Sequence, residues 1–141
     1  MMKFEKLSLT NVESALELCK NNFGEDCNDF DITSVLNKSS RYNNCFVVLD
    51  DDLVVGLIVG TPIKTPFDKL PMIYISYVCT HKNYRGLGIA KNLVKYLIDY
   101  CKTHLGAKEY LLHTIKGNTA AESVYRSVGF TEDVNGFYLK V

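Results

Sequence analysis

A glycine-containing stretch of the sequence has the residue types of an anion-binding loop. It consists of Arg85, Gly86, Leu87, Gly88, Ile89 and Ala90. Glycines let the backbone approach a ligand closely, and the free N–H groups and dipole at the start of a following helix favour a phosphate. We therefore expect a pyrophosphate to bind there. The competing interpretation is a tight turn between a strand and a helix, because short glycine motifs are degenerate.

A second set of candidate residues lies on a later helix. Asn118 is a suitable N-cap, and Tyr125 follows it before Gly129 and Phe130. The spacing of Asn118 and Tyr125 is about two helical turns, so both lie on nearly the same face, about 10 Å apart along the axis. One elongated ligand could contact both side chains. Alternatively, Asn118 only caps the helix and Tyr125 is a half-buried packing residue.

The elements that must position these residues follow from hydrophobic periodicity. We expect a strand over 72–80, a helix over 89–105, a strand over 109–115 and a helix over 118–128 that ends at Gly129. This alternation of strands and helices indicates an α/β or α+β fold with at least one parallel strand pair.

The strand over 72–80 is expected to lie in the middle of the sheet. Regular alternation divides its side chains into two faces: Tyr74, Ser76, Val78 and Thr80 on one, and Ile73, Ile75, Tyr77 and Cys79 on the other. Both faces are mostly apolar, which is typical of a strand covered on both sides.

The first half of the chain and its last residues supply the remaining elements. We expect a helix over 10–21 opened by the capping-box residues Thr10 and Glu13. Two apolar runs separated by three aspartates predict a hairpin. The other expected elements are a strand over 3–7, a short helix near 32–36, hairpin strands over 45–49 and 53–59, and a terminal strand including 137–141.

Composition limits the class of protein. The chain has 141 residues, 47% of them hydrophobic and 23% charged, which predicts one globular domain over 1–141. Sixteen basic and sixteen acidic residues balance, so nothing global attracts nucleic acid or an anionic membrane. No apolar run is long enough to span a membrane, and no signal segment is visible. Five cysteines without CxxC spacing predict reduced thiols in the cytoplasm and no metal site.

Together, the two sets of candidate residues resemble the GNAT family of N-acetyltransferases, which bind acetyl-CoA. Arg85, Gly88 and Ala90 match the family's [QR]-x-x-G-x-[GA] pyrophosphate loop, and the helix from Asn118 to Tyr125 with its Gly129-Phe130 exit matches a second motif. The resemblance implies an α/β fold of the GNAT type. That fold has a central mixed sheet of six to seven strands, splayed parallel strands 4 and 5, and about four helices.

The resemblance also implies a binding mode for acetyl-CoA. The pantetheine arm would pair with the strand edge at Val78, Cys79 and Thr80, and Asn118 would contact the same arm. The amides of 86–90 would hold the pyrophosphate, with Arg85 at the start of the loop.

The implied activity is acetyl transfer to a primary amine, of a small molecule or a peptide, by direct attack. Tyr125 would protonate the departing thiolate, because a phenol with a pKa of about 10 is protonated at neutral pH. The alternative is a non-catalytic module of the same fold that binds or senses CoA.

Several groups are candidates for the general base that activates the amine. Tyr74 and Ser76 occupy strand positions that face the acceptor, and neither is a base at neutral pH. Glu25 and Asp26, in an acidic loop that could attract a cationic amine, are the next candidates, and a water chain is a third. The same loop can also be a solvated segment with helix caps.

The remaining polar and aromatic candidates are expected to be structural. His81, His104 and His113 lack a metal-ligand spacing and are interpreted as structural or surface residues, with His113 inside a strand. Phe137 and Tyr138 in the terminal strand indicate packing or the edge of a possible homodimer.

Overall fold

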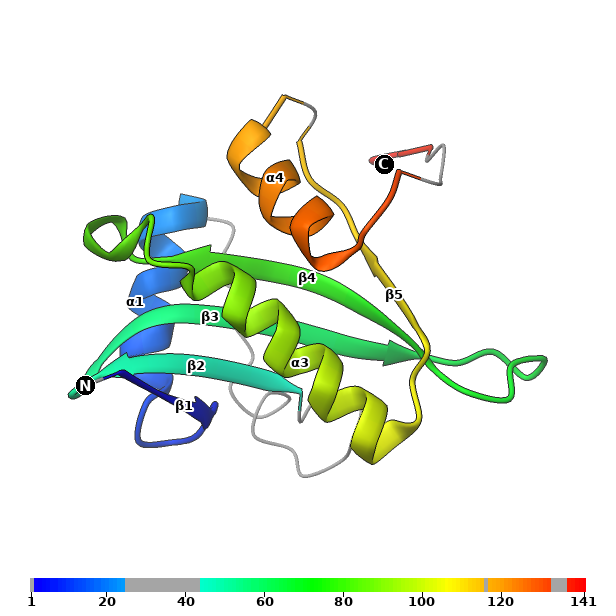
Figure 1. The fold of residues 1–141 in the computed structure, drawn as a ribbon, viewed down its shortest axis with the longest axis horizontal. Helices are drawn as coiled ribbons and strands as arrows, with labels where there is room; N and C mark the ends of the chain where they lie inside the picture. Colours follow the sequence, from blue (N-terminus) through cyan, green and yellow to red (C-terminus); the bar gives the residue numbers. More distant parts are fainter. Residues whose placement is uncertain (1, 25–43, 116, 133–136) are drawn as a thin grey trace.

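The computed structural model describes residues 2–24, 44–115, 117–132 and 137–141. A five-stranded sheet of order β1-β2-β3-β4-β5 forms its centre (Figure 1). The strands are β1 (Met2–Lys6), β2 (Cys45–Asp50), β3 (Leu53–Ile63), β4 (Met72–Thr80) and β5 (Glu109–Leu112). Neighbouring strands are antiparallel except for the parallel pair β4 and β5.

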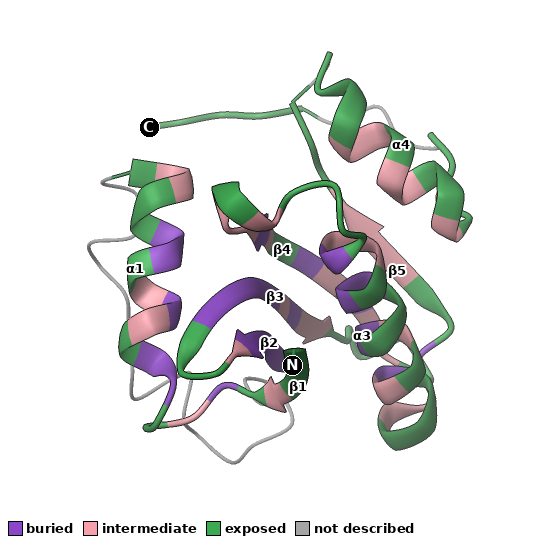
Figure 2. Ribbon diagram, turned by 60° about the vertical axis from the view of Figure 1, so that its left-hand side comes forward, coloured by how far each residue is buried: buried purple, intermediate pink, exposed green. Residues whose placement is uncertain are grey.

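Helices cover both faces of the sheet. One face carries α1 (Val12–Phe23), and the opposite face carries α3 (Ile89–Leu105), on which α4 (Thr119–Val128) packs (Figure 2). A short 3₁₀ helix, η2 (Lys82–Tyr84), connects β4 to the loop before α3. The mixed α/β architecture with a parallel β4–β5 pair is the one that the sequence predicts.

The β2–β3 hairpin forms where the aspartates separate two apolar runs. Asp50 pairs with Leu53 across the turn, and Asp51 has a φ of 52°, a left-handed conformation that Asp tolerates better than most residues. Almost every residue of β2 and most of β3 are buried, because these strands lie between helices on both sides. The predicted hairpin is confirmed, and β3 extends further than expected, to Ile63.

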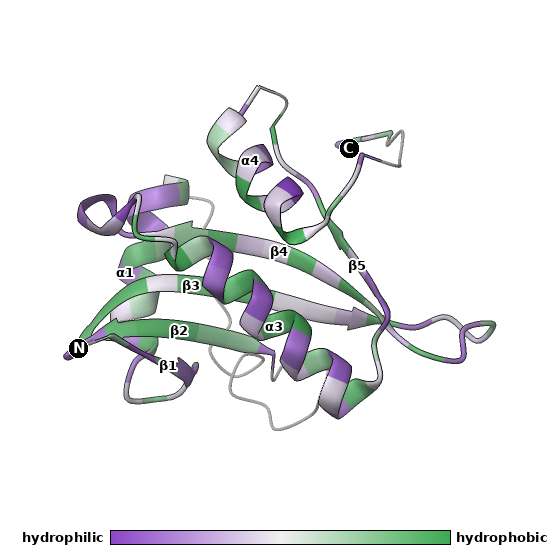
Figure 3. Ribbon diagram, viewed as in Figure 1, coloured by the Kyte–Doolittle hydropathy of each residue, from purple (hydrophilic) through white to green (hydrophobic). Residues whose placement is uncertain are grey.

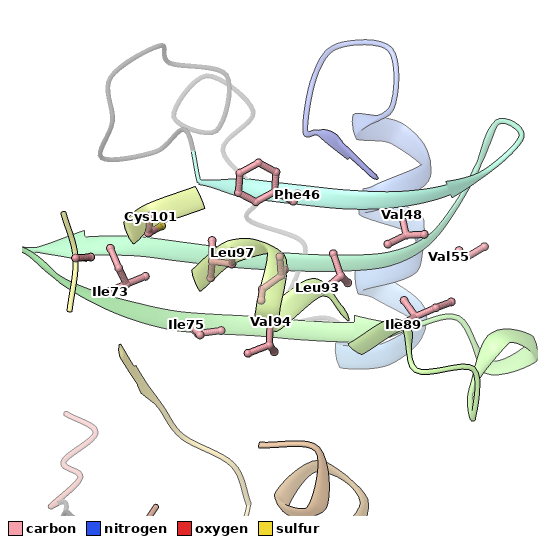
Figure 4. Packing of buried hydrophobic residues seen from close by; sticks show 12 residues of the cluster. Phe46, Val48, Val55, Ile73, Ile75, Ile89, Leu93, Val94, Leu97 and Cys101 are labelled. Atoms are coloured by element: carbon pink, nitrogen blue, oxygen red, sulfur yellow. The ribbon is translucent and has the colours of Figure 1, made fainter. Parts of the chain in front are cut away.

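Apolar stripes on the helices form two core layers. In Figure 3 the side of α3 that faces the sheet is hydrophobic and its outer side is hydrophilic. Leu93, Leu97 and Cys101 on this stripe have no exposed surface and pack on strand side chains such as Phe46 and Ile73 (Figure 4). A separate cluster joins α1 to the other face of the sheet.

Two glycines of β3 let α3 lie close to the sheet. A Cβ added to Gly56 would lie 2.6 Å from Cγ2 of Ile89, and one added to Gly60 would lie 2.8 Å from Cδ2 of Leu97. Both distances are shorter than van der Waals contact, so the helix occupies the space that a side chain would need. The start of α3 therefore packs directly on β3, and the glycine-containing loop lies beside it.

A bulge in β4 reverses its two faces. Tyr77 pairs with Val59 and Ile75 pairs with Gly60, so the residue between them, Ser76, has no partner in β3. Ile75 belongs to the cluster under α3, whereas Cys79 belongs to the cluster under α1. The single alternation expected over 72–80 is therefore wrong beyond Ser76, because an extra residue shifts the period by one.

Two further expected strands differ from the structure. β5 ends at Leu112 rather than at 115, and residues 137–141 form no strand. Phe137 and Tyr138 are almost fully exposed, and a run of apolar residues becomes a strand only where a neighbouring backbone completes its hydrogen bonds. The short helix expected near 32–36 lies outside the described residues. The described chain thus has five strands and three α-helices, rather than six to seven strands and about four helices.

Candidate active site

The two parallel strands separate halfway along β4. β5 pairs with β4 only from Met72 to Ile75, so β4 has no β5 partner from Ser76 to Thr80. We call the point where the strands part, after Ile75 and Leu112, the fork. β3 covers the other edge of β4 along this length, so the fork leaves one edge of β4 without a strand neighbour within the described chain.

Backbone groups of Val78 and Thr80 face the gap beyond the fork. The N–H of His81 donates to the C=O of Val55 at 2.8 Å, which identifies the residues of β4 that bond to β3. Alternate residues of an antiparallel strand bond to the same neighbour, so Cys79 faces β3 and Val78 and Thr80 face the gap. Cys79 is also buried, at 5% exposure. Three residues were expected to pair with an extended ligand. Two of them, Val78 and Thr80, thus have backbone groups that face the gap.

The glycine-containing loop is a backbone cradle at the start of α3. Gly86 and Gly88 have φ values of 81° and 78°, a left-handed conformation that favours glycine. No heavy atom lies within 4 Å of a Cβ built on Gly86, and the nearest atom to one on Gly88 lies 4.0 Å away. The space beside both glycines is therefore open. Gly88 is the N-cap of α3, so the first N–H groups of the helix, beginning with Ile89 and Ala90, have no intrahelical acceptor.

Contacts on both sides hold this loop in place. His81 caps η2, and its Nδ1 atom accepts a hydrogen bond from the N–H of Asn83 at 3.1 Å. The hydroxyl of Tyr84 donates to Asp50 Oδ2 at 2.6 Å, and this bond to a carboxylate raises the pKa of Tyr84. His81 thus has a structural role, as expected.

Arg85 lies at the rim of the loop. Its guanidinium donates to Oδ1 of Asn22 at 3.3 Å, close to the end of α1. Arg85 and Leu87 are exposed, the latter by 59%. The side chain of Arg85 is thus accessible at the rim of the loop.

Asn118 and Tyr125 lie at the start and near the end of α4. Oδ1 of Asn118 accepts a hydrogen bond from the N–H of Ala121 at 3.3 Å, so Asn118 caps the helix. Tyr125 is half-buried, packs against the cluster under α3, and lies 6.1 Å from Phe130 between ring centroids. Burial raises the pKa of Tyr125 above its ordinary value. Its phenol is therefore protonated at neutral pH.

A tyrosine and a histidine meet at the fork, which the sequence analysis did not foresee. Oη of Tyr74 lies 3.4 Å from Nδ1 of His113, and their ring centroids are 5.7 Å apart. His113 follows Leu112, the last paired residue of β5, and so lies just beyond the strand rather than inside it. No local pattern in the sequence marks this pair, because it depends on the register of two parallel strands.

Tyr74 and Tyr125 lie on opposite faces of the sheet. Ile73 and Ile75, the neighbours of Tyr74, point into the cluster under α3, so Tyr74 points to the face of α1. Tyr125 packs on the face of α3. The phenol of Tyr125 and the Tyr74–His113 pair thus lie on opposite faces of the sheet.

Aromatic and polar residues line the α1 side of β4. Tyr77 contacts Phe23 of α1 edge to face, with ring centroids 5.1 Å apart. Ser76 is exposed at the bulge. Glu25 and Asp26, the other expected acceptor residues, lie outside the described residues.

Among the described residues, no three or more His, Cys, Asp or Glu side chains gather in a way that could hold a metal ion. None of the described helices has the length and apolar character to cross a bilayer.

The fold and the site define a mixed α/β domain whose two parallel strands part beside an open glycine-containing loop. The sequence profile of the Acetyltransferase (GNAT) family matches residues 10–130. The chain therefore belongs to the GNAT family, and the expectation from its two motifs is confirmed.

Named relatives in sequence are N-acetyltransferases. N-alpha-acetyltransferase 30 of Schizosaccharomyces pombe is 35% identical over 92 residues, which cover 60% of this chain and 55% of that protein. N-acetyltransferase 8B of Homo sapiens is 27% identical over 100 residues, which cover 70% of this chain and 44% of that protein. The chain thus spans about half the length of the curated relatives it matches.

Solved structures share the fold over nearly the whole chain. An aminoglycoside acetyltransferase from an uncultured soil metagenomic sample, in complex with trehalose, has a TM-score of 0.80 at 24% identity and covers 99% of this chain and 96% of its own. AAC(6')-Iy, in complex with the bisubstrate analogue CoA-S-monomethyl-acetylneamine, has a TM-score of 0.82 at 20% identity and covers 100% and 99%. At these identities the likeness establishes the fold alone.

Proposed function

We propose that this chain is an acetyl-CoA-dependent N-acetyltransferase that acetylates a primary amine. The observation that carries the proposal is the fork in the sheet, which ends beside an open two-glycine cradle at the start of α3. Membership of the GNAT family and the names of the sequence relatives support it.

Acetyl-CoA fits the groups that face the gap. The amides of its pantetheine arm match the backbone groups of Val78 and Thr80, in the manner of an added strand. Its diphosphate matches the N–H groups at Gly86–Ala90 and the positive end of the helix dipole, with Arg85 at the rim. Asn118 caps α4 through Oδ1 and can donate from Nδ2 to the same arm.

Tyr125 is assigned as the general acid. A C–N bond forms between the amine and the thioester carbonyl, the C–S bond breaks, and the departing thiolate takes a proton. A raised pKa keeps the phenol of Tyr125 protonated at neutral pH, so it can donate its proton to the sulfur as negative charge develops there, and solvent returns a proton to the phenolate after CoA leaves. Direct attack needs no acyl-enzyme.

The Tyr74–His113 pair is assigned to the amine. An amine is mostly protonated at neutral pH, so a base must remove a proton for the nitrogen to attack. Imidazole is the side chain suited to this task near neutral pH, and the 3.4 Å contact with Tyr74 orients the ring of His113. The amine thus approaches from the α1 side, while the thiolate leaves toward Tyr125.

The acceptor proposed is a cationic small molecule or a peptide amine. Tyr74, Tyr77 and Phe23 form an aromatic wall on the α1 side, and aromatic faces attract cations. Aminoglycoside acetyltransferases among the structural neighbours and N-alpha-acetyltransferases among the relatives represent these two amine classes.

The test is calorimetric titration of the protein with acetyl-CoA, followed by an amine screen that detects CoA release. Gly88→Val places a side chain in the cradle and is expected to abolish binding. Gly106→Val is the matched control, because Gly106 has a φ of 66° as the C-cap of the same helix, far from the loop. It should cost similar stability and keep binding.

Each outcome separates the alternatives. Binding lost only in Gly88→Val, together with acetylation of an amine, supports the proposal. Binding without turnover of any amine supports instead a non-catalytic module that binds CoA. If the unmodified protein does not bind acetyl-CoA, both the acetyltransferase and the CoA-binding module are contradicted. The loop is then only a turn between a strand and a helix.

A further inference from the structure

β1 is an edge strand with an open side. Among the described residues it pairs only with β2, and four of its five residues are exposed. Met2 and Phe4 are exposed by 44% and 38%. An exposed strand edge is a template for pairing with another chain unless charge, proline or a covering element prevents it.

Hydrogen bonds identify the backbone groups on the open side. The N–H of Leu7 donates to the C=O of Cys45 at 2.9 Å, so in the antiparallel ladder Lys3 and Glu5 also bond to β2. Met2, Phe4 and Lys6 therefore direct their backbone groups outward. The C=O of Lys6 agrees with this, because it accepts a hydrogen bond from Asn11 Nδ2 at 3.0 Å.

The side chains of β1 divide into a charged face and an aromatic face. Lys3 and Glu5 lie on one face and form an ion pair at 2.9 Å. On the other face, Phe4 stacks on Tyr96 of α3 with ring centroids 5.1 Å apart and an angle of 10°. Lys6 donates to the hydroxyl of Tyr100 at 2.6 Å. The aromatic face is partly open, since Tyr96 is exposed by 40%.

We propose that β1 pairs antiparallel with β1 of a second copy of this chain, about a two-fold axis at Phe4, so that one sheet runs through both copies. In this register Phe4 exchanges backbone hydrogen bonds with its equivalent, and the N–H of Lys6 donates to the C=O of Met2 in the other copy. This pairing thus uses the outward backbone N–H and C=O groups of β1 and leaves the C=O of Lys6 bonded to Asn11.

Charge selects this register over its neighbours. Pairing centred on Phe4 places Lys3 opposite Glu5 of the other copy on both sides of the axis. Pairing centred on Lys3 or on Glu5, which would also match outward groups, places like charges directly opposite each other. The centred register also brings the two Phe4 rings together, so the aromatic surface of Phe4 and Tyr96 becomes continuous across the dimer.

The inference is tested with the untagged chain by sedimentation over a wide range of concentration. Lys3→Glu and Glu5→Lys each place like charges opposite each other, and each should weaken self-association by roughly tenfold or more. The double variant Lys3→Glu/Glu5→Lys should restore it, and an equimolar mixture of the two single variants should form a heterodimer. Lys108→Glu, beside β5 at the other edge of the sheet, is the control and should associate normally.

Two results would overturn the inference. The first is a monomer at every concentration of the unmodified chain. The second is a dimer that neither single variant weakens, which would place the interface elsewhere. Lys3 and Glu5 form an exposed pair of little value to folding, so a thermal melt should show that both variants fold normally.

Discussion

Tyr125 and His113 lie on opposite faces of the sheet. Tyr125 belongs to α4 and packs toward α3, whereas His113 contacts Tyr74 on the side of α1. An acetyl transfer must add a proton to the leaving thiolate and remove a proton from the amine. The acid and the base that we propose thus lie on separate faces, and each can be tested by replacing a single residue.

Replacing Tyr125 tests the general acid. Tyr125→Phe keeps the packing of the ring and removes the proton that the thiolate needs. We expect kcat to fall about 100-fold, the scale of general acid catalysis, while the affinity for acetyl-CoA is unchanged. Steady-state kinetics and calorimetry measure the two effects, with Tyr138→Phe, at an 89% exposed position, as the control. An unchanged kcat would exclude Tyr125 as the acid.

Replacing His113 tests the proposed base on the other face of the sheet. His113→Gln removes the imidazole that would accept the proton of the amine. We expect kcat/KM to fall about 100-fold, the scale of general base catalysis, while the affinity for acetyl-CoA is unchanged. His104→Gln, on α3 beside Tyr100, is the control and should keep normal kinetics. If kcat/KM of His113→Gln matches that of the unmodified enzyme, another group is the base.

The close packing of α3 on β3 determines where the glycine-containing loop lies. A methyl group on Gly56 would press on Cγ2 of Ile89, which is branched at Cβ and cannot turn away freely. Ile89 is the first residue of α3 and directly follows Gly88. Packing in the core and the geometry of the glycine-containing loop are therefore coupled through one contact.

Gly56→Ala tests this coupling. Overpacking should lower the free energy of unfolding by about 1–3 kcal/mol and weaken acetyl-CoA binding as the start of α3 shifts. Urea unfolding and calorimetry measure the two effects. Thr103→Ala, on the exposed side of α3, is the control and should change neither. A Gly56→Ala protein with normal stability and affinity would show that α3 does not rest on this glycine.

Buried thiols make the whole molecule sensitive to alkali. Burial raises the pKa of Cys45 to about 12 and that of Cys101 to about 11, above the ordinary value of about 8.5. At pH values between the ordinary thiol pKa and these raised pKa values, the unfolded chain loses protons that the folded chain retains. The stability that the buried thiols contribute is therefore fully present below the ordinary thiol pKa. It is lost as the pH rises toward the pKa values that these thiols have in the folded protein.

Urea unfolding at a series of pH values measures this dependence. The free energy of unfolding should fall above about pH 8.5, by at most about 1.4 kcal/mol per pH unit for each thiol. Cys45→Ala should be less stable at neutral pH but should lose stability more slowly as the pH rises. A Cys45→Ala protein with the same slope as the unmodified chain would contradict the role of this thiol.

Features set by neighbouring residues were predictable from the sequence. The apolar stripe of α3, the aspartate turn of the β2–β3 hairpin and the helix between Asn118 and Gly129 all form within short segments. Each depends on local periodicity, turn residues and caps, which are written in the order of the amino acids. The cradle at Gly86 and Gly88 was also predictable, because glycine is the residue that adopts a positive φ without strain.

Tertiary structure decided the rest, because it joins segments far apart in the chain. The bulge at Ser76 reverses the faces of β4, and no local pattern marks where one strand gains a residue over its neighbour. The terminal residues 137–141 have the pattern of a strand but no partner strand among the described residues. Tyr74 meets His113 only through the register of two parallel strands, which the packing of whole elements determines rather than the order of residues in either strand.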